Sequence, residues 1–193
     1  MNTATAPKLM TLEEFLAIPE DGVERWLIRG ELREKRDTDM TRRNKTHSIT
    51  EARITGILWM WLCQQPKPRG EIVCGEAGFI LRRDPETISA GVDVALITAN
   101  QADTRDPDTN MIVGPPTLIA EVTSPNDTED EIGERVEEYL DCGVPVVWVI
   151  STRFRSVHVH RPGTSPVALD DRATLTADPE LPGFSCPVAD FFR

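Results

Sequence analysis

The longest stretch of helical periodicity in the chain runs from about Lys45 to Gln64. Its apolar residues recur every three or four positions, as they do on one face of an amphipathic helix, and the pattern ends before Pro66. A shorter helix is predicted to begin at Thr11, because the sequence TLEE places a glutamate three residues after a threonine in a capping box. This helix should end before Pro19, since proline cannot continue it.

A strand, a helix and a second strand are predicted between Thr117 and Ile150. The sequence TLIAEVT at 117–123 is a nearly continuous apolar strand, and TEDE at 128–131 is a second capping box, which opens a helix that reaches about Cys142. VPVVWVI, the segment that ends at Ile150, is rich in β-branched residues and is typical of a buried strand. Because two strands joined by a helix favour a right-handed crossover, we expect these two to pair in parallel.

The other strands are predicted to be antiparallel. A hairpin is expected over Gly22–Glu34, with Arg29 and Gly30 in its turn. Four further segments combine apolar residues with strand-like length: Glu71–Cys74, Phe79–Arg82, Gly91–Ile97 and Phe154–Arg161. Gly75 and Gly78 are expected to form the turn between the first two of them, and Thr98–Pro116 is polar and is expected to be a long loop.

This order of elements predicts a mixed α/β fold, in which helices flank a central mixed β-sheet. The 193 residues suit one domain. We expect a disordered lead over residues 1–10 and a single domain over residues 11–193. Hydrophobic residues make up 39% of the chain, which is enough for a folded core and argues against wholesale disorder.

The formal net charge of −11 argues against a protein that holds long duplex DNA through a broad basic surface. It leaves room for an enzyme with a local basic rim, and basic residues do gather between Arg33 and Lys45. The chain has no apolar run near the roughly 20 residues that cross a bilayer, and its first residues lack the apolar core of a signal peptide. We therefore expect a cytoplasmic protein without a membrane partner.

The four cysteines lie far apart in the sequence and form no C-x-x-C pair, so a structural zinc site is not expected. Cys63, Cys74 and Cys142 lie in apolar or helical contexts, and we predict that they are buried free thiols.

Two carboxylates interrupt the apolar strand sequences. Asp93 lies within GVDVALI, and Glu121 lies within TLIAEVT. Burying a carboxylate is costly unless it is paired or binds a cation. Since the two strands are candidate neighbours, we interpret the acids as ligands of Mg²⁺, with Mn²⁺ as a substitute. A metal ion held there could activate water and neutralise charge on a phosphodiester. Alternatively, each acid alone could cap a turn or pair with an arginine.

Several segments resemble the Uma family of restriction endonucleases, within the PD-(D/E)XK nuclease superfamily. They are TLEEFLAIPEDG, GEL at 30–32, DVALI, LIAEVTSPND, GERVEEYLDCGVPVVWVI and LPGF. Their order and spacing cover nearly the whole chain. The resemblance implies a restriction-endonuclease-like fold, dependence on magnesium and hydrolysis of phosphodiester bonds in DNA.

The resemblance also assigns roles residue by residue. Asp93 and Glu121 match the metal-binding aspartate and glutamate of the family, although the proline that usually precedes the aspartate is Val92 here. The lysine that the superfamily places two residues after the glutamate is Thr123, and the lysine that the family takes from the next helix matches Arg135. Arginine can hold a phosphate, but it cannot act as a general base at neutral pH.

Four other positions correspond to polar positions of the family, and three of them keep the family's kind of residue. An acidic position in the first hairpin is occupied here by Trp26, whereas His47, Glu76 and Glu31 match family residues of the same kind. These last three are secondary candidates for the site. Each also has a structural interpretation: a capping or packing histidine, a solvated turn residue and a water-facing hairpin residue.

Two functions follow as hypotheses. The first is a DNA endonuclease in which Asp93 and Glu121 bind the metal and Arg135 stabilises the scissile phosphate. The alternative is a catalytically weakened nuclease-fold protein that binds a nucleic acid or a protein without cutting, which the departures at Trp26, Thr123 and Arg135 motivate. A homodimer is expected in addition, through the long helix that carries Trp59 and Trp61.

Overall fold

The computed structural model describes residues 9–193 except 20, 22, 24, 35–43, 85, 103–105 and 125–126. Its strands are β1 Arg25–Ile28, β2 Glu31–Glu34, β3 Glu71–Arg83, β4 Glu86–Ile97, β5 Ile112–Val113, β6 Leu118–Thr123, β7 Val147–Ser151, β8 Ser156–His160, β9 Val167–Leu169, β10 Thr174–Thr176 and β11 Ser185–Pro187. Its helices are α1 Leu12–Leu16, α2 Lys45–Leu62, α3 Ala99–Ala102, α4 Glu129–Asp141 and the 3₁₀ helix η1 Val188–Phe191.

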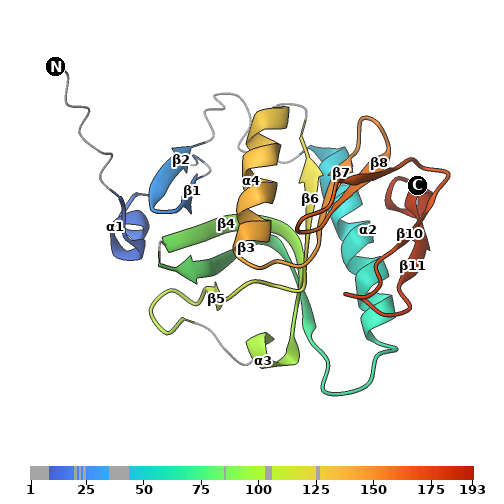
Figure 1. Ribbon diagram of the computed structural model, residues 1–193, viewed down its shortest axis with the longest axis horizontal. Helices are drawn as coiled ribbons and strands as arrows, with labels where there is room; N and C mark the ends of the chain where they lie inside the picture. Colours follow the sequence, from blue (N-terminus) through green and yellow to red (C-terminus); the bar gives the residue numbers. More distant parts are fainter. Residues whose placement is uncertain are drawn as a thin grey trace.

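Nine of the strands form one mixed sheet in the described part of the chain, with the order β2-β1-β4-β6-β7-β8-β9 and with β3 and β5 paired beyond β4 (Figure 1). The β6 and β7 strands are parallel, and α4 connects them as the predicted crossover helix. β8 returns antiparallel to β7, as its place in the sequence predicted. The predicted mixed sheet flanked by helices is therefore confirmed.

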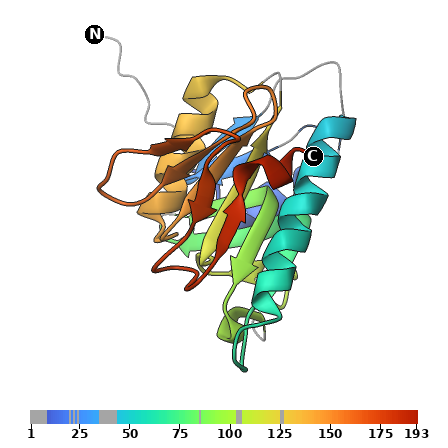
Figure 2. The same ribbon diagram turned by 90° about the vertical axis from the view of Figure 1, so that its right-hand side faces the viewer.

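The two long helices cover opposite faces of the sheet (Figures 1 and 2). Alternate residues of the strands divide the core accordingly. Leu58 of α2 packs in one cluster with Leu118 and Trp148, while Val136 of α4 packs in another with Ile119. The C-terminal segment joins the α2 side, where the ring of Phe184 lies 5.4 Å from that of Trp148. This two-sided burial explains why β6 and β7 read as nearly continuous apolar sequences.

The helix starts agree with the sequence prediction. Thr11 and Thr128 both form complete capping boxes, in which each threonine hydroxyl accepts a backbone N–H and the glutamate three residues later accepts the N–H of the threonine. α2 begins after Asn44, whose side chain caps the N–H of His47 at 2.9 Å. Gly143 follows α4 with a φ of 96°, which suits the residue after a helix C-cap.

Two predictions about the strands are wrong. The segments Glu71–Cys74 and Phe79–Arg82 are not separate strands joined by a turn, because both belong to β3, which pairs with β4 along its length. Gly75 and Glu76 form a bulge instead, and Gly78 is paired with Ala90 of β4. The expected loop Thr98–Pro116 contains the short helix α3 and the short strand β5.

The cysteines are free thiols, as predicted, but two of them are not buried. Cys63 and Cys74 are exposed, Cys142 is half-buried and Cys186 is buried. Cys63 follows the last turn of α2 on its outer side, where helical periodicity alone does not separate a core thiol from a surface one. Burial raises the pKa of Cys142 to about 11 and that of Cys186 to about 12.

Candidate metal centre

Asp93 lies where β4 and β6 separate. The ladder between these strands ends at the pair Val94–Ala120, and Asp93 is the next residue of β4. Beyond this pair, the side chain of Asp93 replaces the backbone as the hydrogen-bond acceptor for β6. Its Oδ2 accepts the N–H of Val122 at 2.8 Å. The residue is only 3% exposed. Glu121 follows Ala120 in β6, so the two predicted acids lie directly beyond the last pair of this ladder, on neighbouring strands as expected.

The bulge in β3 lies directly opposite Asp93. β3 and β4 are in register at Cys74–Val94 and again at Ala77–Val92, so Gly75 and Glu76 together face the single residue Asp93. Both bulge residues have positive φ values, 77° and 66°. A bulge bends a strand and redirects its polar groups. The N–H of Gly75 accordingly leaves the ladder and donates to Oε1 of Glu51 on α2 at 2.9 Å.

His47, Glu51 and Asp93 come together beside this bulge. Nε2 of His47 lies 3.3 Å from Oδ1 of Asp93 and 3.8 Å from Oε2 of Glu51. One ligand atom from each residue lies within 4.8 Å of the others, an arrangement that could hold a metal ion. The N-cap interaction of Asn44 places His47 in the first turn of α2, and Glu51 follows one turn later on the same side.

Glu121 faces the other long helix. It is 7% exposed, and its Oε1 accepts the hydroxyl of Tyr139 on α4 at 2.8 Å. A hydrogen bond from a neutral hydroxyl orients the carboxylate without neutralising its charge. Thr123, at the position of the superfamily lysine, ends β6 and donates its hydroxyl to the carbonyl of Ile150 at 3.4 Å.

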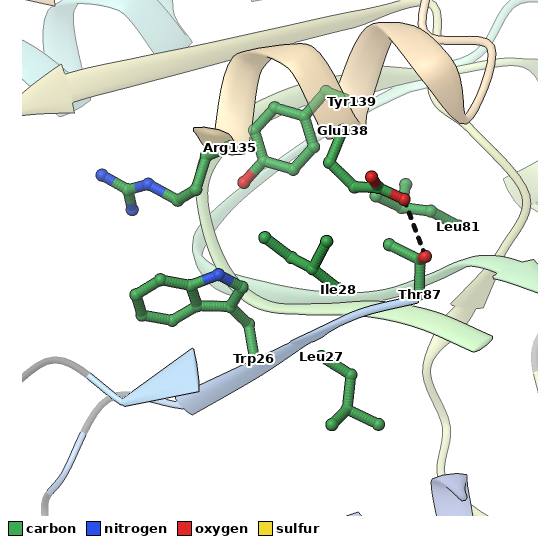
Figure 3. Close-up of a pocket in the computed structure, with 8 residues that line it drawn as sticks. All are labelled: Trp26, Leu27, Ile28, Leu81, Thr87, Arg135, Glu138 and Tyr139. Atoms are coloured by element: carbon green, nitrogen blue, oxygen red, sulfur yellow. Dashed lines mark hydrogen bonds between the residues drawn. The ribbon is translucent and has the colours of Figure 1, made fainter. Parts of the chain in front are cut away.

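Arg135 lies on α4, one turn before Tyr139, and its guanidinium lies over the indole ring of Trp26, 5.7 Å from the ring centre. Figure 3 shows these two side chains together at one end of a small pocket between α4 and β1. Nη2 of Arg135 is also 4.0 Å from Oδ1 of Asp127, and the side chain is 15% exposed. Two of the residues that depart from the family pattern, Arg135 and Trp26, are thus in contact with each other, as a cation stacked on an aromatic face.

A buried carboxylate lies at the other end of the same pocket (Figure 3). Glu138 of α4 is 4% exposed and accepts hydrogen bonds from Arg82 of β3 and from the hydroxyl of Thr87 in β4, the latter at 2.9 Å. Arg29 of the hairpin turn donates to it at 3.1 Å and to Asp141 at 2.6 Å. This network fixes α4, and with it Arg135 and Tyr139, against the hairpin and the sheet.

The remaining secondary candidates lie outside the three-residue group. The carboxylate of Glu76 lies against the backbone of Gly91, since a Cβ added there would be 2.2 Å from its Oε2. Glu31 forms an ion pair with Arg33 at 2.9 Å, and its side chain is 44% exposed. Arg33 itself also pairs with Glu134. Most of the basic segment between Arg33 and Lys45 lies outside the described residues, because residues 35–43 are not among them.

Two partners of the acids were not found from the sequence. Glu51 is one helical turn after His47, a spacing that places two ligands on one side of a helix. That spacing is the one feature of the sequence that indicates Glu51 as a possible ligand. It becomes informative only when Asp93 is known to lie beside both residues. Tyr139 is one turn after Arg135, a spacing that does not by itself indicate a contact with Glu121. Its contact with Glu121 depends on how α4 packs over β6.

Among the helices that the structure describes, none is sufficiently long and apolar to cross a membrane.

Comparisons with known proteins agree with the fold and with the family resemblance. The described fold is similar to the crystal structure of "a putative nuclease belonging to DUF820 from Anabaena variabilis ATCC 29413", with a TM-score of 0.74 and 18% sequence identity over 95% of this chain and 97% of that one. This likeness supports the restriction-endonuclease-like fold. No curated protein matches the chain.

The family model Uma2, described as "Putative restriction endonuclease", matches residues 12–189. Its match begins at the first helix and ends within η1, so it spans all the elements that carry the candidate residues. The resemblance of the separate sequence segments is thereby confirmed, and it supports a nuclease. The chain belongs to the Uma2 family.

Proposed function

We propose that this protein is a Mg²⁺-dependent endonuclease that hydrolyses phosphodiester bonds in DNA, with Asp93 and Glu121 as its metal-binding carboxylates. The observation that carries the proposal is the position of these two buried acids on neighbouring strands, where β4 and β6 separate. Two carboxylates in an apolar sheet are costly unless a cation or a strong hydrogen-bond set compensates them. A bound metal ion would activate water and stabilise the developing phosphate charge.

The donor set suits such an ion. Both acids offer oxygen ligands, which Mg²⁺ prefers, and each acid is already oriented by a hydrogen bond. Ligands that are held by a second set of hydrogen bonds lose less freedom when they bind a metal. The backbone of Val122 orients Asp93, and the hydroxyl of Tyr139 orients Glu121. His47 and Glu51 add further donors on the α2 side of Asp93.

Arg135 is proposed to hold the scissile phosphate. Its guanidinium stays protonated at neutral pH, so it contributes charge and hydrogen bonds and takes no proton from water. The indole ring of Trp26 lies against one face of the Arg135 guanidinium and limits its orientation. We therefore assign Arg135 to phosphate binding and charge stabilisation, and we assign the metal-binding step to the two acids.

The test is cleavage of supercoiled plasmid DNA. The purified protein is expected to nick the plasmid with Mg²⁺ or Mn²⁺ and to leave it intact in EDTA. Arg135→Ala should weaken cleavage, because a charge-assisted phosphate contact is lost. An absence of cleavage with either ion over a range of salt concentrations would contradict the proposal, as would cleavage that persists in EDTA.

The alternative function is a nuclease-fold protein that binds nucleic acid or protein without cutting. The stacking of Arg135 on Trp26 favours it, because both positions depart from the family pattern and neither supplies a general base. The same plasmid assay separates the two functions. If Arg135→Lys cuts DNA and the original protein does not, the chain is a degenerate enzyme whose remaining role is binding.

We also propose a homodimer that pairs through α2. Trp59 and Met60 on its outer side are 51% and 66% exposed, and together they offer an apolar surface for a symmetric contact. A symmetric dimer would bring two sites to two DNA strands. Light scattering after size-exclusion chromatography should give twice the monomer mass at micromolar concentration, and Trp59→Glu should return it to the monomer mass. A monomeric mass for the unmodified protein would refute the dimer.

A further inference from the structure

Asp93 presents its two carboxylate oxygens to different neighbours. Oδ2 accepts the N–H of Val122, the residue after Glu121, and so belongs to the β6 side. Oδ1 is 3.3 Å from Nε2 of His47, and so belongs to the α2 side. A carboxylate whose two oxygens face different neighbours can bind a cation on each side, and pairs of cations act together in many nucleases and phosphatases.

We propose that His47, Glu51 and Asp93 form a second cation position, on the α2 side of Asp93, and that this position prefers Mn²⁺ or a similar transition-metal ion to Mg²⁺. The proposal rests on the proposed function in one respect, because it shares Asp93 with the Asp93–Glu121 site. It adds His47 and Glu51 as ligands, which the proposed function does not require.

The separations among the three residues fit one ion. Atoms that bind an octahedral ion at about 2.1 Å lie about 3 Å apart when adjacent and about 4.2 Å apart when opposite. Nε2 of His47 is 3.3 Å from Asp93 Oδ1 and 3.8 Å from Glu51 Oε2, and all three ligand atoms lie within 4.8 Å of one another. Both separations from His47 lie between these two values, so the three ligands lie close enough to share one ion.

The bulge in β3 supplies an independent reason to regard Glu51 as a ligand. The Gly75 N–H binds Oε1 of Glu51, and this leaves Oε2 as the oxygen that faces His47. Metal-binding carboxylates are commonly held by such a hydrogen bond to the other oxygen. The bulge that provides it lies opposite Asp93, so the same irregularity in the sheet serves two of the three ligands.

The ligand chemistry sets the preference among ions. Mg²⁺ and Ca²⁺ select oxygen, whereas imidazole nitrogen suits transition-metal ions, and Mn²⁺ accepts both nitrogen and carboxylate oxygen. His47 is 2% exposed, Asp93 is 3% exposed and the side chain of Glu51 is 14% exposed, so bulk water competes weakly for the ion. A mixed nitrogen and oxygen set in a buried position is expected to bind Mn²⁺ more tightly than Mg²⁺.

The simpler interpretation is a hydrogen bond or ion pair between His47 and Asp93 with no metal. It makes the opposite prediction for Mn²⁺, because the nitrogen would then stay bound to a proton. A measurement that detects nitrogen next to manganese therefore separates the two interpretations directly. It is unambiguous in this chain, which has three histidines in total.

The experiment is pulsed electron paramagnetic resonance of Mn²⁺ added to full-length protein free of any histidine tag. We expect coupling to an imidazole nitrogen, and we expect it to persist when His158 and His160 on β8 are both replaced by glutamine. That variant leaves the site untouched and assigns the nitrogen to His47. Absence of nitrogen coupling, or its loss in the His158→Gln/His160→Gln variant, would overturn the proposal.

A calorimetric titration with Mn²⁺ gives the second readout. The unmodified protein should bind two ions per chain, and Glu51→Gln, whose amide oxygen can still accept the Gly75 N–H, should lose the tighter ion or bind it at least tenfold more weakly. Equal binding of one ion, or of two ions, by both proteins would refute the second position. Neither readout depends on DNA cleavage. The experiments can therefore refute the second cation position while Mg²⁺-dependent cleavage is observed, and they can support it when no cleavage is observed.

Discussion

Asp93→Asn is expected to reduce metal-dependent DNA cleavage by more than about a hundredfold. Residues that merely orient a metal ligand contribute roughly tenfold to a hundredfold, and Asp93 is proposed to be a ligand itself. The amide oxygen of asparagine can still accept the N–H of Val122, so the separation of β4 and β6 should persist. The loss should therefore be one of metal binding with the fold retained, measured as plasmid nicking against Mg²⁺ concentration and as thermal unfolding without metal.

The matched control is Asp141→Asn on α4. It removes the same charge from an aspartate whose side chain is 57% exposed and whose partner is Arg29. This variant should cut DNA at nearly the original rate. If Asp93→Asn cuts as well as Asp141→Asn, Asp93 is not part of the metal site and the proposed function loses its main support.

Glu138→Ala is expected to lower the free energy of unfolding by about 2–3 kcal/mol. Removal of one partner from a fully buried ion pair costs about 3–5 kcal/mol. The side chains of Arg29 and Arg82 are 55% and 27% exposed. Water can therefore solvate part of their charge after the glutamate is removed, and the expected loss is smaller than for a fully buried pair. The hydroxyl of Thr87 also loses its acceptor. Urea denaturation followed by circular dichroism measures the change.

Glu134→Ala on the same helix is the control for this prediction. Glu134 pairs with Arg33, and its side chain is 41% exposed, so its removal should change the free energy of unfolding by less than about 1 kcal/mol. Similar losses for both variants would show that the buried network contributes no more than a surface ion pair. Glu138 would then not be the contact that fixes α4 over the sheet.

The sequence predicts best where local chemistry and tertiary structure agree. The capping boxes at Thr11 and Thr128 begin helices at the expected residues, because the threonine and the glutamate satisfy the helix N-terminus without help from elsewhere. The parallel pairing of β6 with β7 follows from the strand–helix–strand order. The apolar composition of both strands follows from burial on two faces.

Prediction from the sequence is wrong where a glycine can occur either in a turn or within a strand. Gly75 and Gly78 have the spacing of a turn, yet β3 continues through both, since pairing with β4 on either side holds the strand together. The bulge at Gly75 is visible only with the partner strand in place. Glu51 could not be identified as a candidate ligand for the same reason. Its carboxylate lies near Asp93 only in the folded chain, and the two residues are more than forty positions apart in the sequence.

Asp93 and Glu121 themselves stood out because each is a carboxylate in an apolar strand. Their relative position also followed from the sequence, as candidate neighbours in the sheet. What surrounds them did not, because Tyr139 and His47 reach them from helices on opposite faces. The packing of α2 and α4 decides those contacts, and no local pattern encodes it.

The most direct test of the central claim is a crystal structure of the protein soaked in Mn²⁺, with data collected at a wavelength where manganese scatters anomalously. The account predicts an anomalous peak within coordination distance, about 2.2 Å, of carboxylate oxygens from both Asp93 and Glu121. A well-ordered site without a peak that touches both residues, at millimolar Mn²⁺, would contradict it.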